Sequence, residues 1–205
     1  IKYIISGHNM STESILPVSW GYKSRDLRYL NDIQNKFGTK KLRNYPKLGF
    51  FNLYLYYPYF KKIKMVFPLD YMSYNKKEAI SHLEKTIGWK QYGGKHHESI
   101  FTRFFQAYYL PKKFGFDKRK PHLSSLIVSN QISREEALSE LKKDPYQDLN
   151  FEEDRAFVLK KLRLSESEFQ KIMKLPKKNY KDYNSNYYLY SVLGRLRKRF
   201  NSLFD

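Results

Sequence analysis

Two short apolar runs in the first third of the chain predict β-strands. Residues 1–5 are almost continuously apolar and stop before Gly7, a pattern typical of a buried strand in a parallel sheet. Residues 63–67 form a second run, which Pro68 closes. The stretch between them, residues 20–60, is rich in Tyr and Lys and has weak periodicity, so we interpret it as an irregular or helical insertion.

Polar residues follow the first predicted strand, at the edge where an open α/β sheet usually binds its ligand. His8, Asn9 and Glu13 come directly after this strand, beside Gly7. The sequence therefore predicts that these four residues border a binding site. A capping role for Asn9 or Ser11 at the start of a short helix explains the same pattern, and the sequence leaves both interpretations open.

The remainder of the chain has helical periodicity. A polar capping residue followed three positions later by Glu marks four expected helix starts, at Asn75, Ser133, Asn150 and Ser165. The expected helices run from Asn75 to Gly88, from about His97 to Leu110, from Pro121 to near Asn130, from Ser133 to near Lys143, from Asn150 to Leu162, from Ser165 to Lys174 and from Tyr187 to Phe200. We therefore expect a helix-rich carboxyl half.

Composition narrows the classes of function. The chain has 205 residues, and 39 Lys and Arg against 20 Asp and Glu give a net charge of +19, which favours anionic partners. Cys is absent, which excludes disulfides, thiolate metal sites and a Cys nucleophile. The most apolar run, residues 49–60, is shorter than the ~20 residues that a spanning helix needs, so we expect no membrane span.

The densest group of ionisable residues lies in a glycine-containing loop before the Phe-rich helix. Gly93 and Gly94 permit close backbone approach, and Lys95 adds a positive charge near the free N–H groups of the first helical turn. This arrangement suits an anion, and His96 and Glu98 follow it as candidate acid–base groups. The alternative interpretation is a glycine C-cap followed by an ordinary amphipathic helix.

The polar side of that helix carries Arg103, beside Thr102 and Gln106. We count Arg103 with the candidate catalytic residues. His96 and His97 are adjacent and diverge by about 100° on a helix, so they do not form the pair at i and i+4 that grips one metal ion. The sequence therefore identifies no metal site.

A second basic segment, residues 112–122, interleaves Lys and Arg with Phe before another helix start. Lys118 and Arg119 are candidates for a phosphate clamp, with Asp117 able to orient one of them. A solvated loop explains the charge equally well. Stacking on single-stranded nucleic acid is a further reading, but no RNA-binding or zinc-finger motif accompanies it.

Taken together, these motifs resemble the carboxyl-terminal portion of the N-acetyl sugar amidotransferases, which are surface-polysaccharide enzymes of the PP-loop ATP pyrophosphatase superfamily. The resemblance covers residues 1 to about 141 and weakens beyond them. The motifs that carry it are Trp89 with residues 92–99 (YGGKHHES), 102–106 (TRFFQ), 113–119 (KFGFDKR) and 122–127 (HLSSLI), and residues 129–138 (SNQISREEAL) and 6–9 (SGHN) with Glu13 also fit.

The resemblance implies the carboxyl-terminal part of a Rossmann-like PP-loop fold of the adenine nucleotide alpha hydrolase type, an α/β fold, followed by a helix-rich half. Residues 1–70 would then hold the end of the nucleotide-binding sheet and an insertion, and residues 71–205 the helical region. The superfamily's Ser-Gly-Gly-x-Asp-Ser loop is not in this sequence. We therefore expect that the loop lies upstream and that this chain is a fragment that does not activate ATP alone.

The resemblance also implies an activity. Such enzymes use ATP with Mg²⁺ to adenylate the acetamido oxygen of a nucleotide-activated N-acetyl sugar, and ammonia then replaces AMP to give an acetamidino group. With no Cys for glutamine hydrolysis, ammonia is expected from a separate glutaminase and an ammonia-channelling partner. We expect a cytoplasmic enzyme of lipopolysaccharide or related glycan synthesis. A basic nucleic-acid-binding module and a PP-loop enzyme that modifies transfer RNA are the alternatives.

The same resemblance implies a role for individual residues of these motifs. Lys95 and Arg103 are expected to stabilise phosphate charge, and His96 or Glu98 to take the proton that the attacking ammonia loses. The expected nucleotide-binding residues are Gly7, His8, Asn9 and Glu13 at the adenylation site, and Gly93, Gly94, Lys118 and Arg119 near the diphosphate.

Overall fold

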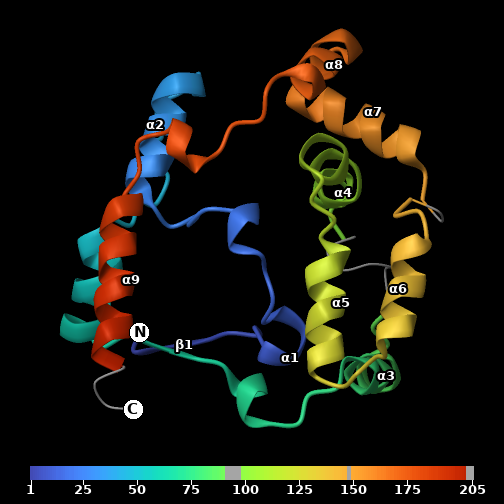
Figure 1. The fold of residues 1–205 in the computed structure, drawn as a ribbon, viewed down its shortest axis with the longest axis horizontal. Helices are drawn as coiled ribbons and strands as arrows, with labels where there is room; N and C mark the ends of the chain where they lie inside the picture. Colours follow the sequence, from blue (N-terminus) through green and yellow to red (C-terminus); the bar gives the residue numbers. More distant parts are fainter. Residues whose placement is uncertain (91–97, 147–148, 202–205) are drawn as a thin grey trace. The chain divides into compact units, whose positions relative to one another are not determined.

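The computed structural model describes residues 1–90, 98–146 and 149–201 (Figure 1). The chain forms two compact units. The first unit comprises Ile1–Ile4, Gly21–Val66 and Lys178–Asp205, and the second comprises Ile5–Trp20 and Phe67–Lys177. Each unit thus combines segments that are distant in the sequence. The division between residues 1–70 and 71–205 that the sequence suggested stays a prediction.

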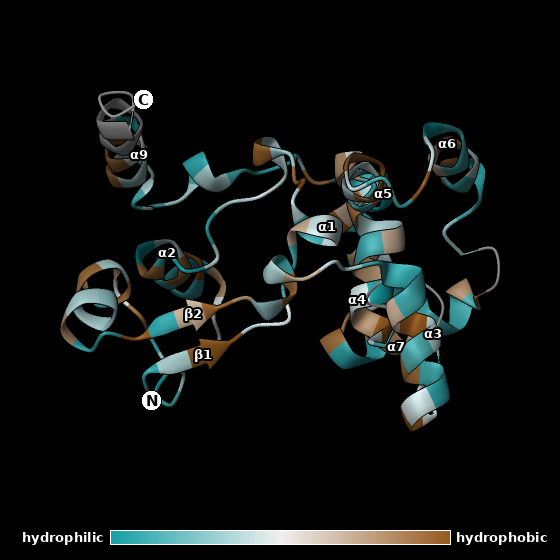
Figure 2. Cartoon of the chain, turned by 90° about the horizontal axis from the view of Figure 1, so that it is seen from below, coloured by the Kyte–Doolittle hydropathy of each residue, from teal (hydrophilic) through white to brown (hydrophobic). Residues whose placement is uncertain are grey.

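The two predicted strands form, but the first is not buried. β1 (Tyr3–Ile5) and β2 (Lys64–Val66) pair in a two-stranded sheet, and their arrows point the same way in Figure 2. The expectation of a buried strand is wrong, because Tyr3 is 62% and Ile5 77% exposed. Within the described residues this sheet has two strands, too few to bury a face.

The other regular elements of the first unit are helices and a helical turn. They are α2 (Leu27–Phe37), a π-helix (Asn52–Phe60), a 3₁₀ turn (Tyr180–Asp182) and α9 (Tyr187–Asn201). α2 begins where it does because the Asp26 carboxylate accepts the backbone N–H groups of Arg28 and Tyr29, which have no partner within the helix. The insertion predicted over residues 20–60 is therefore partly helical.

The second unit is helical throughout its regular structure. Its elements are α1 (Met10–Glu13), 3₁₀ turns at Val18–Trp20 and Pro68–Tyr71, α3 (Lys76–Ile87), α4 (Ile100–Phe104), a π-helix (Phe105–Phe114), α5 (Arg119–Val128), α6 (Arg134–Lys142), α7 (Phe151–Leu162) and α8 (Glu166–Lys174). α1 and α6 pack on α5, and α4 packs on α7. The helix-rich carboxyl half that the sequence predicted is confirmed.

All four predicted capping residues begin helices. Ser133 and Ser165 each form a complete capping box with the Glu three positions on, and Asn75 and Asn150 accept N–H groups of the first turn. Gly88 ends α3 in the left-handed conformation at φ 66°, which glycine adopts without steric cost. Local hydrogen bonding thus fixes most helix starts.

Two helix starts differ from expectation. The Phe-rich helix begins at Ile100, not near His97, because the Ser99 hydroxyl caps it, and it widens into the π-helix after Phe104. α5 begins at Arg119, two residues before Pro121, because the Asp117 carboxylate accepts the Arg119 N–H. Pro121 therefore lies in the first turn but not at its first position.

The core of the second unit is an aromatic and aliphatic cluster where α4, α7 and α8 meet. Phe104, Val158, Leu159 and Phe169 are buried together, and Phe151 packs against them. The Phe104 ring lies 5.9 Å from the Phe169 ring and 6.1 Å from the Phe151 ring. Burial of these side chains sets the orientation of α4, which carries the predicted catalytic helix face.

No helix in the part of the chain that the structure describes has the length and apolar character needed to cross a membrane.

Candidate functional site

The centre of the predicted catalytic loop, Gly93, Gly94, Lys95 and His96, lies outside the described residues. Glu98 is described, is exposed and immediately precedes Ser99. The Ser99 hydroxyl accepts the Thr102 N–H at 3.3 Å and so caps α4. The structure therefore places Glu98 directly before α4, and not on the helix as the expected start near His97 implied.

Arg103 lies on the next turn of α4 and forms a bidentate ion pair. Its Nε and Nη2 donate to the two carboxylate oxygens of Asp154 on α7, at 2.6 and 2.5 Å. The Tyr146 hydroxyl donates to the same carboxylate at 3.2 Å. Asp154 is only 3% exposed, so this fork fixes α4 against α7 inside the unit.

The contacts with Asp154 help to raise the pKa values of Arg103 and Tyr146, and both shifts preserve these contacts. The hydrogen bond to Asp154 raises the pKa of Arg103 above its usual value despite partial burial. Burial, followed by the negative charge of Asp154, raises the pKa of Tyr146. Arg103 thus stays charged and Tyr146 stays a hydrogen-bond donor.

In the described structure Arg103 positions α4, and its expected contact with phosphate stays a prediction. Its partner Asp154 was not identified from the sequence. The reason is that Asp154 belongs to an acidic first turn, residues 152–154, which the favourable interaction of acids with a helix amino terminus explains without any partner.

The amino-terminal residues of the predicted site gather around α1. His8 Nε2 lies 3.6 Å from a Glu13 carboxylate oxygen, and the His8 ring meets Phe67 edge-on at 5.7 Å. Asn9 is buried and caps α1, because its Oδ1 accepts the Thr12 N–H at 2.9 Å. The capping interpretation of Asn9 is confirmed.

Hydrogen bonds hold α1 along the carboxyl half of α5. The Ser125 hydroxyl accepts the Ile15 N–H at 3.1 Å, and the Ser129 hydroxyl donates to the Ser11 carbonyl at 2.9 Å. Lys118 and Arg119 lie at the opposite, amino end of α5, which is a helix of ten residues and therefore about 15 Å long. Among the described residues, α1 thus contacts the carboxyl half of α5, whereas Lys118 and Arg119 lie at its amino end.

The basic segment before α5 contacts the carboxyl ends of two helices. Lys113 is buried, and its Nζ donates to the carbonyls of Ile172 and Leu175 at the end of α8, the latter at 3.0 Å. Carbonyls in the last turn and at the cap of a helix lack the N–H partner four residues on that interior carbonyls have, although the Ile172 carbonyl also accepts the Leu175 N–H at 3.3 Å. A cation at a helix carboxyl end also interacts favourably with the helix dipole.

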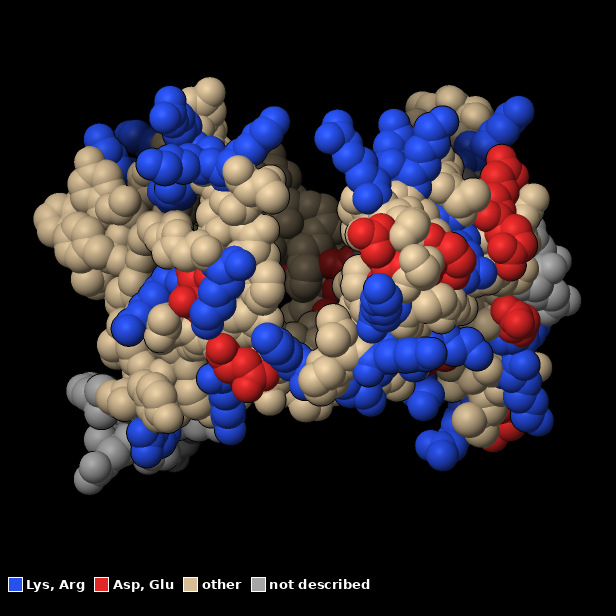
Figure 3. Space-filling view, turned by 90° about the horizontal axis from the view of Figure 1, so that it is seen from above, with Lys and Arg blue, Asp and Glu red and all other residues tan. Residues whose placement is uncertain are grey.

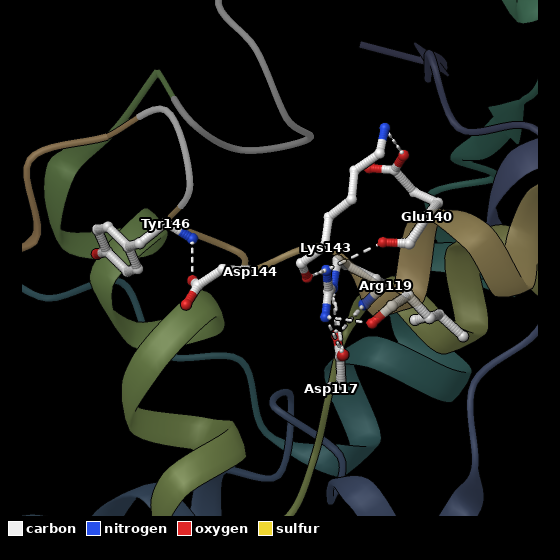
Figure 4. A network of polar contacts seen from close by, with 7 residues as sticks. Asp117, Arg119, Glu140, Lys143, Asp144 and Tyr146 are labelled. Atoms are coloured by element: carbon white, nitrogen blue, oxygen red, sulfur yellow. Dashed lines mark hydrogen bonds and ion pairs between the residues drawn. The ribbon is translucent and has the colours of Figure 1, made fainter.

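Arg119 makes the equivalent contact with α6 (Figure 4). Its Nη1 donates to the carbonyls of Glu140 and Lys143, at 3.3 and 2.7 Å, while Nε and Nη2 donate to the Asp117 carboxylate. Burial raises the pKa of Asp117, but the hydrogen bonds from Arg119 outweigh it and hold that pKa below its usual value.

The two cations therefore fasten α5 and the preceding π-helix to α6 and α8. Phosphate binding by Arg119 stays a prediction, and it would compete with these carbonyl contacts. The sequence left the choice between a clamp and a solvated loop open, and the described structure shows a third arrangement, in which the basic segment binds helix ends within its own unit.

Replacing Arg119 with lysine is expected to lower the free energy of unfolding by about 1–2 kcal/mol, because one ammonium group does not reproduce the fork between Asp117 and the end of α6. Urea denaturation followed by circular dichroism measures this change. Lys120→Ala, at the exposed neighbouring position, is the control and is expected to unfold like the parent protein. Equal stability of the Arg119→Lys protein would contradict the assigned contact.

The described helices and capped turns form a helix-rich carboxyl half. Residues 98–197 match the model of the C-terminal domain of WbpG-like LPS biosynthesis proteins. The match bears out the resemblance to the C-terminal portion of a surface-polysaccharide family over these residues. The match supports a role in LPS or related glycan biosynthesis. No curated protein and no solved structure matches the chain.

Proposed function

We propose that the complete protein is an ATP-dependent amidotransferase that converts the acetamido group of a nucleotide-activated N-acetyl sugar into an acetamidino group. The observation that carries the proposal is the WbpG-like match, because residues 98–197 contain Glu98, Arg103 and the basic segment up to Arg119. The resemblance of the motifs supplies the reaction. Residues 1–70 would contribute the end of a Rossmann-like PP-loop sheet, and the enzyme would act in the cytoplasm, where nucleotide sugars are made.

The proposed reaction activates a poor leaving group. The amide oxygen attacks the α-phosphorus of ATP, and pyrophosphate leaves. Ammonia then attacks the amide carbon, loses a proton and displaces AMP, which carries the oxygen away. Lys95 and Arg103 would stabilise phosphate charge, and His96 or Glu98 would accept the proton. Glu98 lies at the amino terminus of a capped helix, where N–H groups also face an anion.

Mg²⁺ is expected to accompany ATP in this proposal. Among the described residues, no group of three or more His, Asp or Glu side chains is arranged to hold a metal ion. We therefore assign no metal ligand in this chain and derive no step through the ion. His8 and Glu13 lie together near the expected nucleotide, but they are a pair and not a metal site.

The nitrogen donor in this proposal is ammonia. This chain has no Cys, so it does not itself supply the thiolate nucleophile that glutamine hydrolysis of the usual kind needs. Following the resemblance, the proposal includes a separate glutaminase and a partner that channels ammonia. The complete protein is expected to form product with an ammonium salt but none with glutamine alone.

Lys95→Ala in the complete protein is expected to abolish formation of the amidino sugar, because the loop loses its positive charge at the reacting phosphate. The purified protein is given ATP, Mg²⁺, an ammonium salt and a UDP-N-acetylhexosamine. Mass spectrometry detects the amidino product, while AMP and pyrophosphate are assayed separately. Lys160→Ala, at an exposed position of α7, is the control and is expected to keep full turnover.

Two outcomes would contradict the proposal, the first in the role of Lys95 and the second in the substrate. Normal turnover by the Lys95→Ala protein would remove Lys95 from the reacting centre. AMP formation with transfer RNA and none with the nucleotide sugar would favour the transfer-RNA reading. Lys and Arg are spread over the face shown in Figure 3 and are interspersed with Asp and Glu. The mixture of charges on this face does not favour a nucleic acid over another anionic partner.

A further inference from the structure

The first unit contains an open groove of about 440 Å³ that none of the predicted site residues line. One wall is α2, and the other includes the segment that precedes α9. The polar residues of the groove are Arg28, Asn31, Asp32, Asn35, Asn184 and Asn186. Four of these six are asparagines, so amide groups, each with both a donor and an acceptor, dominate the polar part of the lining.

The α2 wall is a regular stripe. Its four polar residues stand at positions i, i+3, i+4 and i+7, which share one helix face. Among the described residues, the side chains of Arg28, Asn31 and Asn35 make no hydrogen bond and no ion pair. Their donors and acceptors are therefore available to a ligand in the groove.

The opposite wall is pre-organised by two carboxylates. The backbone N–H and the Nδ2 of Asn184 both donate to Asp32, at 3.1 and 2.9 Å. Asn186 donates in the same way to the buried Asp26, at 2.6 and 2.8 Å. Each amide is thus held in one orientation with its Oδ1 left as an acceptor, so a ligand that uses it incurs little ordering entropy.

An aromatic ring and a glycine complete the lining. The Phe50 ring packs against the rings of Tyr54 and Tyr190, whose centroids lie 4.9 and 5.5 Å away. These contacts restrict the orientation of the Phe50 ring. Gly49 leaves the groove open beside it. A Cβ at this position would meet only Leu27 Cδ2, at an ordinary 3.9 Å, so a larger residue can be introduced there without backbone strain.

We propose that this groove binds the sugar ring of a glycan precursor, with Arg28 placed for a phosphate or carboxylate attached to that ring. Planar amide groups suit vicinal hydroxyl and acetamido groups, because both carry donors and acceptors at matching spacing, and a fixed aromatic ring suits the apolar face of a sugar. The open groove has both polar and apolar lining, which fits a sugar ring, with its hydroxyl groups and its apolar face, better than a wholly apolar ligand. This inference deepens the proposed function and rests on it for the identity of the sugar.

The first test measures binding to the complete protein by titration calorimetry, with NMR for weak ligands. The probes are N-acetylglucosamine, its 1-phosphate, UDP-N-acetylglucosamine and UDP. Asn31→Ala and Asn35→Ala are each expected to raise the Kd of all three sugar ligands about 2–10-fold, which is the loss of one hydrogen bond. Arg28→Gln is expected to weaken the phosphorylated ligands and to leave the neutral sugar unchanged.

Gly49→Leu provides a steric test, because its side chain would fill the groove beside Phe50. It is expected to raise the Kd for the sugar ligands about 100-fold or more while the circular dichroism spectrum and the urea midpoint stay at parent values. Asn44→Ala is the matched control, since Asn44 lies in the same unit and does not line the groove. Its Kd values are expected to equal those of the parent protein.

The outcomes separate the groove from the reaction. Undiminished sugar binding by the Gly49→Leu and Asn31→Ala proteins would overturn the groove assignment, even if amidino sugar is still formed. Binding of UDP alone that accounts for the whole affinity would also overturn it. Sugar binding that these variants weaken, in a protein that forms no amidino product, would support the groove and refute the amidotransferase reaction.

Discussion

Replacing Asp154 with alanine is expected to lower the free energy of unfolding by about 3–5 kcal/mol, because it removes the counter-charge of the largely buried Arg103 guanidinium. The Tyr146 hydroxyl also loses its acceptor. The apolar cluster around Phe104 would remain between α4 and α7. Urea denaturation followed by tryptophan fluorescence and circular dichroism measures the change, and an unchanged slope with denaturant would show that the unfolded state is comparable.

Two further variants test whether the loss comes from breaking the buried ion pair. Glu152→Ala, on the same helix at a side chain that is 75% exposed, is expected to change stability by less than about 0.5 kcal/mol. The double variant Arg103→Met, Asp154→Leu removes both charges and is expected to recover much of the loss. A loss for Asp154→Ala no larger than that for Glu152→Ala would contradict the role of the buried ion pair.

Replacing Asp26 with alanine is expected to lower the free energy of unfolding by about 3 kcal/mol, since each buried donor left unsatisfied costs about 1–3 kcal/mol. Asp26 is 1% exposed and accepts from the Tyr22 hydroxyl at 2.6 Å as well as from Asn186. It also caps α2. The loss would therefore separate α2 from the start of α9, and chemical denaturation of the complete protein measures it.

The charge of Asp26 predicts a dependence on pH. Burial raises the pKa of Asp26, but hydrogen bonds, first from Tyr22 and then from Asn186, outweigh it and hold the pKa below its usual value. Its stabilisation is therefore complete above the unfolded pKa of about 3.9 and is lost as pH falls through the lower folded pKa. We expect the stability advantage of the parent over Asp26→Asn to shrink in that acidic range. Parallel curves for the two proteins would contradict this assignment.

The sequence predicted the parts of the fold that are decided by neighbouring residues. Ser133 and Ser165 mark helix starts because their hydroxyls bond to N–H groups three residues on, so the signal and its structural effect lie in one turn. The same holds for the end of α3 at Gly88. The prediction that β1 is buried was wrong. Burial depends on which other elements cover a strand, and an apolar run in the sequence does not identify those elements.

The candidate site could be predicted less completely, for the same physical reason. Asn9 caps α1 as its local motif suggested, whereas Glu98 lies just before α4 and not on it. The partners of Arg103 and Lys113 come from residues 51 and 59 positions away, and no local pattern distinguishes a cation that binds a helix end from one that binds phosphate. Nor does a run of polar residues on α2 reveal the groove, which exists because the residues around Asn186 fold back onto that helix.

The bond between Asp26 and Asn186 has a consequence for how the chain can be divided. Asn186 lies inside the region that the family model covers, and Asp26 lies outside it. Tyr190, also inside that region, packs its ring on Phe50, again from outside. The region that the family model matches therefore includes only part of the compact first unit. A polypeptide cut to residues 98–197 would keep the matched region, but Asn186 would lose its contact with Asp26 and the Tyr190 ring its contact with Phe50.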